Sequence, residues 1–210
     1  MKEKLTEIVF IIDRSGSMSG LESDTIGGFN GMLKKQKAEK GEAYVTTVLF
    51  DDRYELLHDH LSIDKVGAMD ETQYFTRGCT ALLDAVGLTI KKMENIVKHQ
   101  KDCNVIIIII TDGYENASKE YSSKKVKQMV NDKKEAGWEF VFLGANIDAV
   151  ETAETIGVNR DSAADYHSDS EGIKIAYCSL SEAISDVRSA GRVKAKSLKS
   201  VREDYEKRKQ

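Results

Sequence analysis

The chain has 210 residues, of which 40% are hydrophobic and 31% are charged. This length and composition suit a single globular domain with a sizeable core. The formal charge is −4, yet residues 192–210 hold eight Lys or Arg against three Asp or Glu. The rest of the chain is therefore acidic. That argues against nucleic-acid binding by the main domain, because phosphate contacts need a basic face.

No segment of the sequence is typical of export or membrane insertion. No apolar run is long enough to span a bilayer, and the N-terminus leads directly into a strand-like pattern without a signal-peptide core. Cys79, Cys103 and Cys178 form neither a disulfide framework nor a CxxC pair, which is usual in a reducing compartment. We therefore expect a cytoplasmic protein that does not bind membranes and is a monomer when free.

The first half of the chain predicts three strands and two helices. Residues 6–13 form a short apolar run rich in β-branched residues, which predicts a strand ending at Asp13. Apolar residues at helical spacing then predict a helix that stops by Gly41. Residues 43–50 and 54–63 predict two strands joined by a tight turn, hence a hairpin. A long amphipathic helix begins at Thr80, after a polar loop.

The second half predicts strands alternating with helices. The unbroken Val-Ile run at 105–110 is typical of a central parallel strand that is buried on both faces. A helix around residues 126–130, a strand at 138–145, a short helix and an edge strand at 162–166 follow. Ser168 with Glu171 predicts a capping box that opens a last helix, which Gly191 ends.

This alternation predicts an α/β fold. We expect a doubly wound, Rossmann-like and mostly parallel central sheet, with one antiparallel hairpin strand and helices on both faces. The domain is predicted to cover residues 1–190. Residues 191–210 are predicted to form a basic C-terminal tail that is helical or disordered.

Side chains with oxygen donors fall at what should be one edge of this sheet. Asp13, Ser15 and Ser17 follow the first strand in the string D-R-S-G-S, Asp112 follows the isoleucine-rich strand, and Thr80 opens the long helix. In open α/β sheets, ligands bind at the carboxyl ends of the strands. Carboxylate and hydroxyl oxygens suit hard cations, so we predict a site for Mg²⁺, with Mn²⁺ or Ca²⁺ as alternatives. These side chains leave at least one coordination position for an outside ligand.

Five neighbouring residues are candidates for the rim of this site. Gly16 and Gly113 would let the backbone turn closely around the ion. Tyr114, Glu115 and Asn116 follow Asp112 and either line the site or belong to a solvated loop.

Together, the D-x-S-x-S string, the loop threonine and the T-D-G sequence resemble the metal-ion-dependent adhesion site (MIDAS) of von Willebrand factor type A (VWA) domains. The resemblance runs over residues 5–188. It implies that the two serines and the threonine contact the metal directly and that the two aspartates bind it largely through water. It also implies that an acidic side chain of a partner protein supplies the last ligand. The sequence lacks the flanking cysteine pair of secreted members, which favours an intracellular, bacterial or phage-type single-domain member.

A hydrolase and a scaffold are alternatives to such a binding module. A metal-assisted phosphoester hydrolase would also use a cation and aspartates on this edge, but no P-loop, nucleophile elbow or general base falls within the motifs. In a scaffold, the cation would only join loops, so metal would raise stability without affecting any interaction. We therefore expect a cation-dependent binding module and not an enzyme.

Two further motifs have structural explanations. The glycine-rich string at 27–31 lies within the first predicted helix, so close packing of that helix on the sheet explains it better than a dinucleotide fingerprint. His58 and His60 are two residues apart in a predicted strand, so we expect them to share one face as solvent-facing or edge-strand residues.

Overall fold

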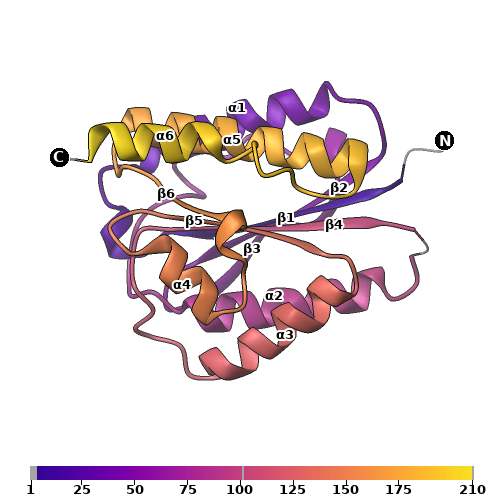
Figure 1. Ribbon diagram of the computed structural model, residues 1–210, viewed down its shortest axis with the longest axis horizontal. Helices are drawn as coiled ribbons and strands as arrows, with labels where there is room; N and C mark the ends of the chain where they lie inside the picture. Colours follow the sequence, from indigo (N-terminus) through magenta and orange to yellow (C-terminus); the bar gives the residue numbers. More distant parts are fainter. Residues whose placement is uncertain (1–3, 101, 210) are drawn as a thin grey trace.

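The computed structural model describes residues 4–100 and 102–209, which form a six-stranded sheet with helices on both faces (Figure 1). The strand order is β3-β2-β1-β4-β5-β6, and all neighbours are parallel except β2 and β3. The predicted α/β fold with one antiparallel hairpin strand is confirmed. The strands are β1 Thr6–Asp13, β2 Ala43–Phe50, β3 Tyr54–Ser62, β4 Asn104–Thr111, β5 Glu139–Gly144 and β6 Ala163–Asp165.

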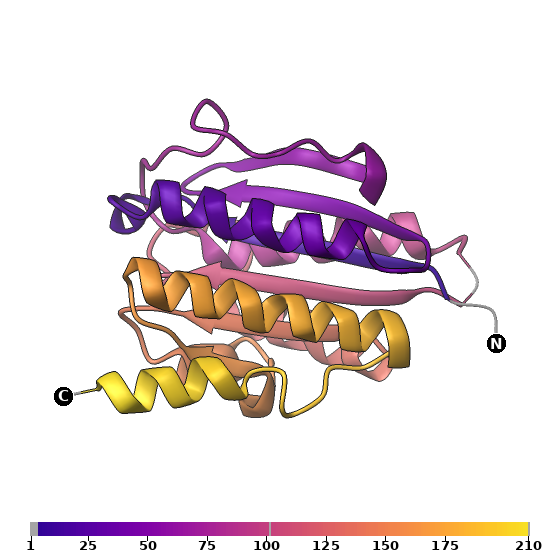
Figure 2. The same cartoon turned by 90° about the horizontal axis from the view of Figure 1, so that it is seen from above.

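Helices α1, α5 and α6 cover one face of the sheet, and α2, α3 and α4 cover the other (Figure 1). From above, α1, α5 and α6 lie side by side in that order (Figure 2). No helix in the described part of the chain is long and apolar enough to cross a membrane. The helices are α1 Glu22–Lys37, α2 Leu82–Val97, α3 Ser123–Glu135, α4 Ala149–Thr155, α5 Ser170–Ala190 and α6 Lys199–Arg208.

The central strands are buried on both faces and divide the core into two layers. Every residue of β1 is buried, as is the run at 105–110 in β4. Successive side chains of a strand point to opposite faces, so Ile8 and Phe10 pack with α1 and α5, whereas Val9 and Ile11 pack with α2 and α3. The two strands that carry the candidate aspartates therefore form the most enclosed part of the molecule.

The histidines of β3 lie on opposite faces of the sheet, so the prediction that they share one face is wrong. The β2–β3 pairing shifts register, and His60 has a left-handed φ of 50°. Both features break the simple alternation of side chains. His58 is buried against Phe29 of α1 and lies 3.0 Å from the Thr47 hydroxyl, whereas His60 reaches the buried Glu7 at 3.1 Å.

Helix α5 begins one residue later than a capping box at Ser168 requires, so that prediction is wrong. Asp169 is the N-cap, and its Oδ1 accepts a hydrogen bond from the Gly172 N–H at 2.8 Å. At the other end, Gly191 adopts φ 75°, the left-handed cap that glycine favours.

Gly28 of α1 serves contact with α5 and not with the sheet, contrary to expectation. A Cβ added at Gly28 would lie 2.4 Å from Cδ2 of Tyr177, whereas one at Gly27 would meet nothing within 4 Å. Gly28 therefore lets the Tyr177 ring lie directly on the backbone of α1.

The basic C-terminal segment contains α6, which packs on α5 and covers the β6 edge. Leu198 and Val201 are buried in the same core layer as α1 and α5. The Arg202 guanidinium donates to the backbone carbonyls of Asp161 at 2.7 Å and Ala163 at 3.0 Å. These bonds use carbonyl groups beside an edge strand that would otherwise be open to another chain.

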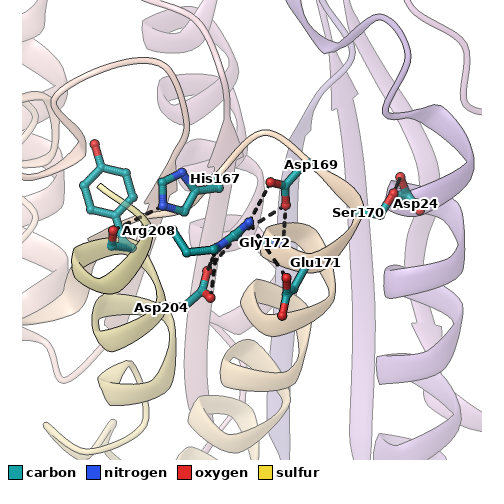
Figure 3. Close-up of polar contacts among 9 residues, drawn as sticks. Asp24, His167, Asp169, Ser170, Glu171, Gly172, Asp204 and Arg208 are labelled. Carbon is teal, nitrogen blue, oxygen red and sulfur yellow. Dashed lines mark hydrogen bonds and ion pairs between the residues drawn. The ribbon is translucent and has the colours of Figure 1, made fainter. Parts of the chain in front are cut away.

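Polar contacts also hold the end of α6 (Figure 3). Arg208 lies between Asp169 at the start of α5 and Asp204 of its own helix, with N–O distances of 2.7 Å to each. His167 Nε2 lies 3.1 Å from the Tyr205 carbonyl oxygen. Exposed ion pairs contribute little to stability, so the buried apolar residues do more to hold α6 in place. Much of the positive charge of the segment is nonetheless paired within the chain.

Candidate metal site

Three loops meet at the carboxyl edge of the central strands. β1 and β4 are parallel neighbours in register, so Asp13 at the end of β1 comes close to Asp112, which follows β4. The loop before α2 folds over this edge, where the Gly16 N–H donates to the Gly78 carbonyl at 3.1 Å. That contact brings Thr80 to the two aspartate loops.

The three hydroxyl groups of the predicted site converge. Ser15 Oγ lies 3.0 Å from Ser17 Oγ and 3.0 Å from Thr80 Oγ1. Ser17 Oγ donates to Asp112 Oδ1 at 2.5 Å. Ser15, Thr80 and Asp112 are buried, while Ser17 is exposed. The cluster can therefore be reached from solvent on the Ser17 side.

Gly113 leaves open the space between these hydroxyls. A Cβ at this position would lie 3.0 Å from both Ser17 Oγ and Thr80 Oγ1. A Cβ at Gly16 would meet only the Gly78 carbonyl, at an ordinary 3.4 Å. The close approach that glycine permits is thus needed at Gly113 far more than at Gly16.

Asp13 lies beneath the hydroxyls and is held on both sides. Its Oδ1 accepts from the Ser15 N–H at 2.7 Å, and its Oδ2 accepts from Thr111 Oγ1 at 2.5 Å. Burial raises the pKa of Asp13 to about 6, and this effect is larger than that of the hydrogen bonds, which lower the pKa. The negative charge of Asp112 acts in the same direction as burial. The carboxylate is well oriented but poorly solvated, so a cation nearby would stabilise its charge.

Asp112 has a buried oxygen with no partner. Among the described residues, its Oδ2 makes no hydrogen bond, and burial raises the pKa of this carboxyl despite the bond from Ser17. No group of three or more His, Cys, Asp or Glu in the described ranges converges in a way that could hold a metal. A cation at this edge would therefore depend on the hydroxyls as well as on the carboxylates.

The arginines nearest to this edge in sequence do not neutralise it. Arg14 is buried and its Nε donates to Asp51 at 2.9 Å, while its other end reaches Glu55 at 2.5 Å. Arg77 Nε donates to the same Asp51 oxygen at 2.7 Å. Burial disfavours ionisation of Asp51, but the bond from Arg77 and the charge of Arg14 together lower its pKa. The positive charges of these arginines and the negative charges of these acidic residues thus compensate one another.

Two further residues, Thr111 and Asn116, hold the site together. Thr111 binds Asp13 through its hydroxyl. Asn116 binds Thr80 in both directions: its Oδ1 accepts from the Thr80 N–H at 2.9 Å, and its N–H donates to the Thr80 carbonyl at 3.0 Å. The threonine within T-D-G was a visible signal, whereas nothing in the sequence linked Asn116 to Thr80.

Two of the rim candidates, Glu115 and Tyr114, behave differently. Glu115 turns inward and accepts from the N–H groups of Leu83 at 2.9 Å and Ser118 at 2.7 Å. Glu115 therefore caps the start of α2 and is not a residue of a solvated loop. Tyr114 is 60% exposed, and its hydroxyl accepts from the Asp148 N–H at 3.4 Å. Tyr114 thus remains at the rim.

Comparison with known proteins places the chain in a family. The model for the von Willebrand factor type A domain matches residues 7–175, and the chain belongs to this family. Domains of this family commonly mediate protein–protein interactions, commonly bind a divalent metal, and are generally not enzymes. No curated protein sequence matches the chain.

Solved structures share the fold at low sequence identity. The vWF domain of the type V pili tip protein Mfa5 from Porphyromonas gingivalis has a TM-score of 0.65 and 11% identity, covering 92% of this chain and 99% of that one. PTMP1 from the mussel byssus has a TM-score of 0.56 and 17% identity, covering 90% and 46%. The ArnB paralog VWA2 from Sulfolobus acidocaldarius has a TM-score of 0.56 and 17% identity, covering 87% and 45%. The chain spans less than half the length of the mussel and archaeal chains.

Proposed function

We propose that this chain is a cation-dependent protein-binding module. Asp13, Ser15, Ser17, Thr80 and Asp112 bind Mg²⁺ as a MIDAS, and the bound ion accepts an acidic side chain from a partner protein. The observation that carries the proposal is that Asp112 Oδ2 is buried beside converging hydroxyls and has no hydrogen-bond partner among the described residues. As part of the same proposal, we infer that the protein is intracellular and cytoplasmic, has a bacterial or phage origin, and is monomeric when free.

The spacing of the hydroxyls supports a small ion. Octahedral Mg²⁺ binds oxygens at about 2.1 Å, which sets neighbouring ligands about 3.0 Å apart. The Ser15 hydroxyl lies 3.0 Å from both of its neighbours. Mn²⁺ is an alternative with a similar size, and Ca²⁺, with longer bonds, would need the hydroxyls to move apart.

The need for an outside ligand follows from charge and access. Both oxygens of Asp13 are already bound within the protein, and the hydroxyls are neutral. A divalent ion held in this way retains an affinity for one more carboxylate. The exposed Ser17 marks the side from which such a ligand can approach.

Calorimetric titration with MgCl₂ tests the metal site. Ser17→Ala removes one ligand from the cluster, whereas Ser19→Ala removes an exposed hydroxyl two residues away in the same loop. We expect Ser17→Ala to abolish Mg²⁺ binding and Ser19→Ala to leave it unchanged. Equal binding by both variants would refute the assignment.

Affinity capture from the native lysate tests the interaction. The wild type should retain partner proteins in Mg²⁺ and lose them in EDTA, and Ser17→Ala should retain none in either. If Mg²⁺ raises the melting temperature but the captured proteins are the same in EDTA, the cation is a structural element of a scaffold.

A further inference from the structure

Two exposed large apolar side chains lie on loops of the candidate metal site. In the described part of the chain, the large apolar side chains that are exposed are Leu56 of the edge strand β3 at 36%, Phe75 at 41% and Tyr114 at 60%. Phe75 lies in the loop that leads to Thr80, and Tyr114 follows directly after T-D-G. Exposed aromatic residues are enriched at protein interfaces, where they often dominate the binding energy.

Phe75 is held on the β2–β3 side of the site. Its ring centroid lies 5.3 Å from the Arg14 guanidinium carbon and 5.1 Å from that of Arg77. Both arginines bind Asp51, which follows β2. The ring is therefore stacked against oriented cations, although it remains open to solvent.

Tyr114 is held on the opposite side, towards β5. Its hydroxyl is bound by the N–H of Asp148, which precedes α4 in the connection after β5. In the strand order, β1 and β4 lie between β2 and β5. The two aromatic residues thus flank the site from either side.

The spacing of the strands sets the spacing of this surface. Strands lie about 4.8 Å apart, so the ends of β2 and β5 are separated by roughly 14 Å. In an extended peptide, side chains on one face recur about every 7 Å. In such a peptide, the side chains two positions before and two positions after a central residue are therefore roughly 14 Å apart, which matches the separation of the ends of β2 and β5.

We propose that the partner presents an extended segment with one acidic residue and an apolar residue two positions before and two positions after it. The acidic side chain binds the cation, and the apolar side chains contact Phe75 and Tyr114. This inference rests on the proposed function, because the cation anchors the segment. Exposed Asp52 and Asp148 at the two sides of the site would repel further acidic residues, which favours uncharged flanks over a polyacidic segment.

Selection from a random-peptide phage library tests the inference, with one panel in Mg²⁺ and one in EDTA. We expect Mg²⁺-dependent peptides to share a Glu or Asp with apolar residues at both flanking positions. Phe75→Ser should erase the apolar preference at one flank and Tyr114→Ser at the other. Each variant should bind the peptides selected on the wild type about tenfold more weakly. Leu56→Ser, which removes an exposed apolar side chain from the edge strand β3, should change neither preference.

Two results separate failure of the inference from failure of the proposed function. Mg²⁺-dependent acidic peptides without flanking preferences, or with preferences that persist in both variants, would overturn the inference and leave the cation site standing. If no peptide is enriched in Mg²⁺ over EDTA, the proposed function fails and the inference fails with it. Melting curves of the variants, whose altered side chains are exposed in the native fold, verify that each is folded.

Discussion

Asp13→Asn isolates the free-energy cost of a buried charge at the candidate metal site. Asparagine has nearly the same shape as aspartate and can keep both contacts. Its Oδ1 can accept from the Ser15 N–H, and its Nδ2 can donate to Thr111 Oγ1. The Thr111 hydroxyl proton can then turn to the Gly113 carbonyl, 3.2 Å away. The substitution therefore removes the charge and little else.

The size of the effect follows from the pKa of Asp13. Burial raises that pKa from 3.8 to about 6, which corresponds to about 3 kcal/mol. Because the folded pKa lies above the unfolded one, the folded state takes up a proton between these values. The contribution of Asp13 to the stability of the metal-free protein therefore falls as the pH rises from about 4 to about 6. Above that range the wild type bears the full penalty, and below it Asp13 is neutral in both states.

Urea unfolding in EDTA at pH 8 and pH 4 measures this difference. At pH 8 we expect Asp13→Asn to be more stable than the wild type by about 3 kcal/mol, and at pH 4 we expect the two to be nearly equal. Mg²⁺ should stabilise the wild type at pH 8 and have little effect on the variant. An Asn variant that is less stable than the wild type in EDTA at pH 8, or a difference independent of pH, would refute this account of the buried charge.

Four further substitutions test the packing around the site and the helices. Gly113→Ala places a methyl group between the hydroxyls, so calorimetry should show Mg²⁺ binding weakened at least about tenfold, with the fold retained. Unchanged binding would contradict the proposed metal site. Gly28→Ala drives a methyl into the Tyr177 ring and should cost about 1–3 kcal/mol in urea unfolding, whereas Gly27→Ala, in open space on the same helix, should stabilise by about 0.5–1 kcal/mol. Equal effects of the two would contradict the α1–α5 packing. Glu115→Ala removes the cap of α2 and should cost about 1–2 kcal/mol by the same assay, and an effect near zero would show that the cap is dispensable.

Local sequence patterns predicted the elements of this fold well. The isoleucine run of β4 is buried on both faces, as its continuous apolar character indicates. The Gly191 cap was equally visible, because a left-handed residue favours glycine. The wrong predictions concern neighbours. Ser168 and Asp169 are both good caps, and only the path of the chain selects Asp169. The faces of His58 and His60 depend on a register shift that no local pattern showed.

The order of the donors along the chain was also enough to predict a candidate site. Parallel strands bring their carboxyl ends to one edge, so Asp13 and Asp112 meet once β1 lies beside β4. The supporting contacts could not be predicted in this way. Asn116 holds Thr80 across 36 residues, and Glu115 reaches Leu83 across 32. Such contacts depend on how two loops close over the sheet edge.

The sequence by itself determined the class of fold and the kind of atom offered to a ligand, because burial patterns and donor chemistry are properties of single residues and their spacing. The tertiary structure decided which of those atoms meet. It left Asp112 Oδ2 buried without a partner among the residues that the structure describes, turned Glu115 inward and kept Tyr114 at the rim. These outcomes arise from packing between segments distant in the chain, where a shift of one residue or one turn changes which groups come into contact.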